Sequence, residues 1–134
     1  MNEKTFSMKE TCEMTGLSYD TLKFYCKQGI IPNVKRDKNN YRIFDENNIG
    51  WIKNLLCLKR CGMSNKEIKE YMNLCILGKS TIPERKRILK KKQENLKEEM
   101  QKIQDSIDFI NYKQTFYDDV LNNKVVYYSY LTKY

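Results

Sequence analysis

Two groups of side chains in this sequence have the residue types to do chemistry: five cysteines and a set of basic residues in the N-terminal half. The cysteines are Cys12, Cys26, Cys57, Cys61 and Cys75, and the chain contains no histidine. Histidine is the residue best suited to proton transfer near neutral pH and a principal ligand for zinc and copper. Ser-His-Asp and Cys-His sites are therefore excluded, and no other cluster of acid, base and nucleophile is present. We expect neither an enzyme nor a cofactor.

Cys57 is the cysteine whose neighbours most favour reactivity. Lys53 lies four residues before it and Cys61 four residues after it, so all three can share one face of a helix. A thiolate is the reactive form of cysteine, and a nearby cation favours it. A disulfide between two cysteines one turn apart would distort a straight helix. The alternative is that Cys57 is a small buried apolar residue, as most free cysteines are.

Composition limits the size and location of the protein. The chain has 134 residues, 25 Lys and Arg against 17 Asp and Glu, and a net charge of +8. Its mean hydropathy of −0.76 is low for a compact globule, which predicts one small core with a thin extension. The polar start is unlike a signal peptide, no apolar run is long enough to span a bilayer, and an odd cysteine count suits a reducing compartment. We therefore predict a cytoplasmic protein without a membrane partner.

Helix start and stop signals organise the first half of the chain. Ser7 and Glu10 form a capping box for a helix that ends before Gly16. Ser18 can cap a second helix that Gly29 ends. Two short helices joined by a tight glycine turn are typical of a helix-turn-helix motif.

A hairpin and two further helices follow. Pro32 blocks a helix, and residues 34–36, 37–40 and 41–44 have strand, turn and strand character, which predicts a basic hairpin, or wing. Asp45 can cap a third helix that Gly62 closes, with apolar positions at Ile49, Ile52, Leu55, Leu56 and possibly Cys57. A capping box of Ser64 and Glu67 begins a fourth helix, and Gly78 ends it.

The chain from Thr81 onward predicts one long helix. A capping box of Thr81 and Glu84, with Pro83 in the first turn, would begin it. If Gln93 and Gln114 fill two positions, apolar residues then alternate at four- and three-residue steps, as in a coiled coil: Leu89, Leu96, Met100, Ile103, Ile107, Ile110 and Tyr117. The stripe could fold back on the N-terminal helices, but these have their own small core. We therefore expect it to pair with a second copy.

Basic residues coincide with the elements that would meet DNA. A recognition helix enters a major groove while a wing follows phosphates or the minor groove. The second helix and the wing carry Lys23, Lys27, Lys35, Arg36, Lys38 and Arg42. This combination of topology and charge predicts DNA binding more strongly than charge alone.

Five ordered motifs resemble the N-terminal domain of the MerR family of transcription regulators, at residues 6–10, 15–18, 21–25, 29–32 and 41–44. The resemblance implies a mainly α fold with a winged helix-turn-helix DNA-binding domain at 1–77, a linker at 78–82, an antiparallel coiled-coil dimerisation helix at 83–121 and a tail at 122–134. It also implies a homodimer that binds and distorts double-stranded promoter DNA, with RNA polymerase as a partner at the promoter.

The same resemblance assigns the DNA contacts. It places Tyr19, Asp20, Thr21 and Lys23 at the groove, with Tyr25 beside them on the DNA backbone. The first wing would consist of Arg36, Tyr41 and Arg42, and the second of Lys59 and Arg60. Lys23 stands where the family usually has arginine, Asn40 where it has a turn glycine, and Phe24 and Phe44 where tyrosine is common. Asparagine tolerates the positive φ that such a turn needs.

A narrower resemblance, over residues 51–85, is to the MerR branch that responds to aldehydes and to nitrosative or related electrophilic stress. It implies that Cys57 is the reactive sensor thiol. Cys75 lies where metal-sensing relatives place a ligand, but residues 111–123 lack the cysteine-containing loop of those relatives. We predict no metal site, and we treat Cys12 and Cys26 as packing residues.

Other functions remain as alternatives. A MerR-type regulator could sense a metal or another small ligand without cysteine chemistry. An architectural DNA-bending factor also uses a small winged helix, but such factors generally lack a long dimerisation helix. A coiled-coil interaction module would explain the long helix but not the basic wing.

Overall fold

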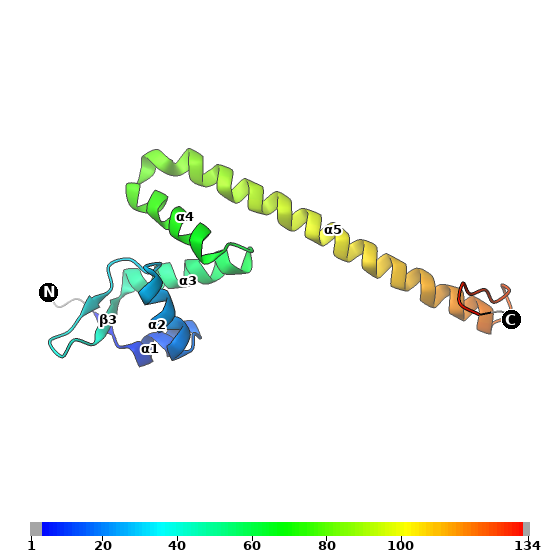
Figure 1. The fold of residues 1–134 in the computed structure, drawn as a ribbon, viewed down its shortest axis with the longest axis horizontal. Helices are drawn as coiled ribbons and strands as arrows, with labels where there is room; N and C mark the ends of the chain where they lie inside the picture. Colours follow the sequence, from blue (N-terminus) through cyan, green and yellow to red (C-terminus); the bar gives the residue numbers. More distant parts are fainter. Residues whose placement is uncertain (1–3, 133–134) are drawn as a thin grey trace. The chain divides into compact units, whose positions relative to one another are not determined.

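The computed structural model describes residues 4–132 and is mainly α, with a small sheet and one long C-terminal helix (Figure 1). The elements in chain order are β1 (Thr5–Phe6), α1 (Met8–Thr15), α2 (Tyr19–Gln28), β2 (Lys35–Arg36), β3 (Arg42–Asp45), α3 (Glu46–Arg60), α4 (Asn65–Leu77), the 3-10 turn η1 (Lys79–Thr81) and α5 (Ile82–Leu121). This order confirms the predicted winged helix-turn-helix followed by a long helix. No helix within residues 4–132 is both long and apolar enough to cross a membrane.

The predicted helix starts are confirmed at four places by side chains that accept hydrogen bonds from free backbone amides, at Ser7, Ser18, Asp45 and Ser64. Ser7 accepts from the amide of Glu10 at 3.1 Å, and Glu10 accepts from the amide of Ser7 at 3.0 Å. Ser64 and Glu67 exchange the same pair of bonds, and Ser18 caps α2 by accepting from the amide of Thr21. Because each bond satisfies an amide that the helix leaves unpaired, these short helices are defined locally by sequence.

The sheet is antiparallel in the order β1-β3-β2, so β3 lies in the middle. Strand β2 pairs with β3 to form the predicted wing, with Lys35 opposite Ile43 and Arg36 opposite Arg42. Strand β1 pairs with the other edge of β3, placing Phe6 opposite Phe44. Strand β1 was not predicted, because two residues are too few to show the alternation that identifies a strand.

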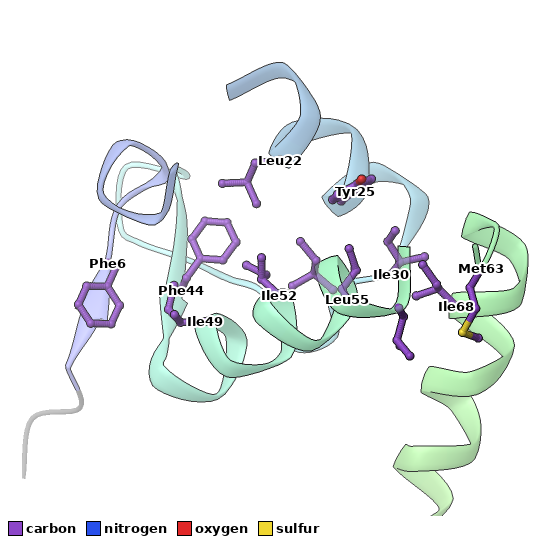
Figure 2. Close-up of a cluster of buried hydrophobic side chains, with 12 residues drawn as sticks. Phe6, Leu22, Tyr25, Ile30, Phe44, Ile49, Ile52, Leu55, Met63 and Ile68 are labelled. Atoms are coloured by element: carbon purple, nitrogen blue, oxygen red, sulfur yellow. The ribbon is translucent and has the colours of Figure 1, made fainter. Parts of the chain in front are cut away.

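One hydrophobic core fixes α2, the sheet, α3 and α4 against one another (Figure 2). Its fully buried side chains include Leu22 from α2, Phe44 from β3, Ile52 and Leu55 from α3, and Ile68 from α4. Residues at three- and four-residue spacing on α3 therefore point inward. Burial of this kind, at about 25 cal/mol per Å² of apolar surface, is the main force that holds the wing and α2 in place.

The connection from α4 to α5 differs from the prediction. Thr81 and Glu84 do not form a capping box, since Thr81 is the last residue of η1 and α5 begins at Ile82. The Thr81 hydroxyl instead donates to the carbonyl of Leu74 at 2.5 Å, and it accepts from Nε of Arg85 at 3.1 Å. Nη2 of Arg85 donates to the carbonyl of Gly78 at 2.7 Å. The carbonyl of Leu74, in the last turn of α4, therefore binds the Thr81 hydroxyl that was predicted to cap α5.

The chain divides into two compact units, Met1–Lys92 and Gln93–Tyr134. The first turns of α5 belong to unit 1, because Ile88 packs against its core and Nζ of Lys92 lies 2.8 Å from Oε2 of Glu67. Unit 2 contains the rest of α5 and a tail without helix or strand in its described part.

Candidate nucleic-acid interface

Helix α2 is anchored by its apolar side and presents its polar side to solvent. Leu22 is fully buried, whereas Tyr19 is 55% exposed and Asp20 is also exposed. Thr21 and Lys23 are half-buried. Helix α2 therefore presents predicted groove residues outward while its position is fixed by the core.

Tyr25 also has a packing role, because its ring is part of the core. Only 8% of Tyr25 is exposed, and its ring centroid lies 6.2 Å from that of the exposed Phe24. Tyr25 comes three residues after Leu22, which places both on the inward side of α2. Its first role is packing, and a contact between its hydroxyl and the DNA backbone stays a prediction.

The wing is held by hydrogen bonds within its own turn. Oδ1 of Asp37 accepts from the amides of Asn39 and Tyr41 at 2.9 and 3.0 Å. Nη1 of Arg36 donates to the carbonyl of Asn40 at 2.8 Å. Asn40 has a φ of 65°, as the replacement of a turn glycine predicted. The tip is therefore ordered, and Tyr41 is 70% exposed beside it.

Two arginines lie directly opposite each other on the wing. Arg36 and Arg42 are cross-strand partners, so their side chains leave the hairpin on the same face. Like charges in this position repel and destabilise a sheet unless an anion lies between or beside them. A phosphate group supplies that negative charge, which makes this pair suited to a nucleic-acid backbone.

The structure brings α2 and the wing together. Burial raises the pKa of the Cys26 thiol on α2, and the positive charges of Arg42 and Arg36 act in the opposite direction. Leu22 of α2 and Phe44 of β3 belong to the same buried core, so the predicted groove helix and the wing strand that carries Arg42 are fixed in one domain.

The second predicted wing lies at the other end of α3. Arg60 is exposed in the last turn of that helix, and Nζ of Lys59 donates to Oδ1 of Asn65 at 2.7 Å. Because the first wing joins the start of α3, the two basic sites are separated by the length of the helix, about 20 Å.

Asn48 and Trp51, which were not predicted to belong to the site, hold the loop before the wing against α3. Nδ2 of Asn48 donates to the carbonyl of Pro32 at 2.8 Å, and Nε1 of Trp51 donates to the carbonyl of Ile30 at 2.7 Å. Both carbonyls belong to the loop that leads into β2. The only sequence signal was the presence of two polar groups near the buried side of α3.

Cys57 is exposed on α3, so the prediction that it might be a buried packing residue is wrong for the single chain. The adjacent inward positions are taken by Leu55 and Leu58, both buried. Lys53 is exposed one turn before Cys57, and the amide of Cys61 donates to the carbonyl of Cys57 at 3.1 Å. A half-buried thiol and a surface cation therefore flank an accessible thiol.

Cys75 lies in a setting that disfavours a metal ion. Its sulfur is 3.8 Å from Nη1 of Arg85, whose positive charge opposes a second cation. Among the residues the structure describes, no three His, Cys, Asp or Glu side chains are grouped as metal ligands. Cys12 and Cys26 are half-buried, and burial raises the pKa of both thiols.

The apolar stripe on α5 is exposed in the single chain. All seven predicted seam residues, from Leu89 to Tyr117, are open to solvent, and Met100 and Ile103 are 66% and 61% exposed. A row of large apolar side chains along one helix is a typical protein-protein contact surface. The predicted seam is therefore available for pairing.

Comparison with known proteins agrees with this geometry. The family model described as "MerR HTH family regulatory protein" matches residues 6–75, which include α1, α2, the wing and most of α4. The chain belongs to the MerR family. Its regulators act as transcription factors rather than enzymes, and the chain is 36% identical over 113 residues to an uncharacterised HTH-type transcriptional regulator of Haemophilus influenzae, covering 84% of each chain.

Other MerR relatives include a DNA complex. The crystal structure of HiNmlR, described as a MerR family regulator lacking the sensor domain and bound to promoter DNA, has a TM-score of 0.73 and 34% identity, covering 89% of this chain and 94% of that one. A putative MerR regulator from Listeria monocytogenes has a TM-score of 0.76 and 30% identity, covering 88% and 89%. The chain is also 33% identical to AdhR of Bacillus subtilis over 90 residues, covering 67% and 64%.

Proposed function

We propose that this MerR-family regulator works as a homodimer that binds and distorts promoter DNA and responds to electrophiles through Cys57. The observation that carries the DNA-binding proposal is the wing, on which Arg36 and Arg42 lie opposite each other and whose strand β3 shares a buried core with α2. The promoter DNA in the HiNmlR complex supports the same ligand.

The contacts follow from the geometry of the region. Exposed α2 side chains, Tyr19 and Asp20 among them, would enter the major groove while Arg36, Tyr41 and Arg42 hold phosphates. Lys59 and Arg60, about 20 Å away along α3, would hold a second backbone segment. Phosphate contacts on both sides of the groove helix fix its register on the duplex, and they supply the force for bending it. RNA polymerase would be the partner that reads the distorted promoter.

The homodimer is supported by the exposed seam and by charge. The segment 84–92 of α5 contains six cations: Arg85, Lys86, Arg87, Lys90, Lys91 and Lys92. The last turn of α5 contains two acidic side chains, Asp118 and Asp119. Parallel pairing would place the two basic segments together, whereas antiparallel pairing places each beside the acidic end of the partner.

The sensor proposal rests on the exposure of Cys57. A nucleophilic thiolate attacks the carbonyl carbon of an aldehyde, and the oxygen takes up a proton to give a thiohemiacetal. Lys53, one turn away, is the cation on the same face. Similarity to AdhR and HiNmlR is compatible with this input.

The wing is the direct test of the DNA-binding proposal. Replacing Tyr41 and Arg42 together by alanine should weaken binding to specific and random DNA alike, and it should lower the salt slope by about 1 per chain, because one phosphate contact is lost. Fluorescence anisotropy at several salt concentrations measures both quantities. Lys97→Ala on α5 is the matched charge control and should leave both unchanged. Equal affinity of the wing variant and the unmodified protein would refute the assignment.

A further inference from the structure

We propose that unit 2 contains a separate binding site for a flat apolar molecule that carries one negative charge. The site is a hollow between the last turns of α5 and the tail, with a volume of about 440 Å³. Its walls include Phe109, Tyr112, Phe116, Tyr128 and Tyr130, with Lys113 among them, and we call it the aromatic hollow. Small-molecule sites commonly measure about 300–1,000 Å³ and are lined by aromatic side chains.

Three aromatic rings on α5 form a stripe that is separate from the predicted dimer seam. Phe109, Tyr112 and Phe116 are spaced by three and four residues, so they form a stripe of their own. This stripe is nearly half a turn away from the seam positions Ile107 and Ile110. Coiled-coil pairing would therefore leave the stripe uncovered, and the tail covers only part of it, since Tyr112 is still 67% exposed.

The tail completes the hollow with a rigid pair of rings. Tyr128 and Tyr130 lie edge to face with their centroids 4.9 Å apart, a favourable aromatic geometry. Tyr130 is nonetheless 88% exposed, so burial in the protein does not account for its position. Exposed aromatic rings in the lining of a cavity are suited to stacking on a flat ligand.

The charge of the hollow selects the kind of ligand. Lys113 is the one ionised side chain among the described residues that line it. Nζ of Lys113 lies 5.9 Å from the ring centroid of Phe109, within the range of a cation–π contact that would hold it over the wall. With a cation and no carboxylate among the described residues of its lining, the hollow favours an anion over a cation. An aromatic carboxylate or sulfonate fits both the rings and the charge.

This site would add a second input to the proposed regulator. Tyr117 lines the hollow and is also a predicted seam residue, so a bound molecule would influence how α5 pairs. That consequence rests on the proposed dimer, whereas binding itself requires only unit 2. The hollow includes no cysteine and none of the proposed DNA contacts.

Two fluorescent probes that share one ring system test the proposal on the full chain without DNA. They are 8-anilinonaphthalene-1-sulfonate, which is an anion, and N-phenyl-1-naphthylamine, which lacks the sulfonate. The anion should bind about fivefold more tightly, the effect of one exposed ion pair. Lys113→Gln should remove this difference without weakening the neutral probe, and Tyr128→Ala should weaken both. Lys102→Gln, also on α5, is the matched control and should bind both probes like the unmodified protein.

Three results would overturn the proposal. The first is equal affinity of the unmodified protein for the two probes, and the second is no binding of either probe. The third is unchanged binding of the anion in both Lys113→Gln and Tyr128→Ala, which would place the probe elsewhere. Cys57→Ser and the wing variant should bind both probes normally, so failure of the DNA or thiol proposals is measured separately.

Discussion

The exposure of Cys57 follows from the pattern of buried residues around it on α3. Leu55 and Leu58 point into the core, and a helix that buries these two positions must turn the intervening Cys57 outward. Cys57 was predicted as a possible apolar position of a helix whose apolar residues lie at three- and four-residue steps. The three-residue step from Leu55 to Leu58 was the better guide.

Labelling should separate the thiols by their surroundings. Burial raises the pKa of Cys12 and Cys26, so a smaller fraction of each is thiolate near pH 7.5, and both should react slowly with an alkylating reagent. Cys57, which is exposed, should react first. Mass spectrometry of the protein after brief exposure to iodoacetamide measures the order.

The functional counterpart is a pair of serine variants. Cys57→Ser should abolish the change in transcription that an aldehyde or a nitrosothiol produces at the target promoter, because the nucleophile is gone. Cys61→Ser, one turn away on the same helix, is the matched control and should keep most of the response. A normal response in Cys57→Ser would rule out the sensor role.

At the scale of elements, the helices were predictable because the residues that cap their ends are neighbours in sequence. Ser7 with Glu10, and Ser64 with Glu67, form capping boxes whose four residues are contiguous in sequence. What could not be predicted depends on residues distant in sequence. Strand β1 exists because β3 offers an edge, and Thr81 is drawn away from capping α5 by the carbonyl of Leu74.

The residues of the site divide in the same way, into those predictable from local sequence and those set by contacts distant in sequence. The wing and α2 were found from local patterns, whereas the packing role of Tyr25 and the support from Asn48 and Trp51 come from tertiary contacts. A sequence pattern gives the spacing of tyrosine on a helix, but it does not show which neighbours bury the ring. Those neighbours belong to the core, which buries most of the Tyr25 ring.

Asn40 provides a test of the wing as an element. Its φ of 65° is strained for most residues, by roughly 1–2 kcal/mol, and asparagine and glycine tolerate it best. Asn40→Val should therefore lower the free energy of unfolding by about 1 kcal/mol or more and weaken DNA binding, while Asn40→Gly should change neither by much. Chemical denaturation and anisotropy measure the two effects. Similar behaviour of the valine and glycine variants would show that the positive φ is unimportant.

At the scale of the whole molecule, the low mean hydropathy and the +8 net charge can be assigned to particular elements. The core is confined to unit 1, and unit 2 exposes its apolar residues along α5 and in the aromatic hollow. A single chain with this arrangement leaves a long stripe of leucine, isoleucine and methionine in water. A second copy removes that surface from solvent without enlarging the core.

Substitutions in the seam test the dimer. Ile103→Asp together with Ile110→Asp should give monomers, because each pair would bury charges in an apolar interface. Analytical ultracentrifugation measures the mass, and DNA affinity should fall with it. Gln101→Asp together with Thr115→Asp adds the same charges on the solvent side of α5 and should remain dimeric. A dimer that persists in the isoleucine variant would mean that the seam lies elsewhere.

The central claim is that two copies of this chain read one DNA site. Its most direct test is selection of bound sequences from a library of random duplexes by the unmodified protein at physiological salt. We expect enrichment of an inverted repeat whose half-sites are related by a two-fold axis, with two chains bound per duplex. Enrichment of no sequence, or of a single half-site bound by one chain, would contradict it.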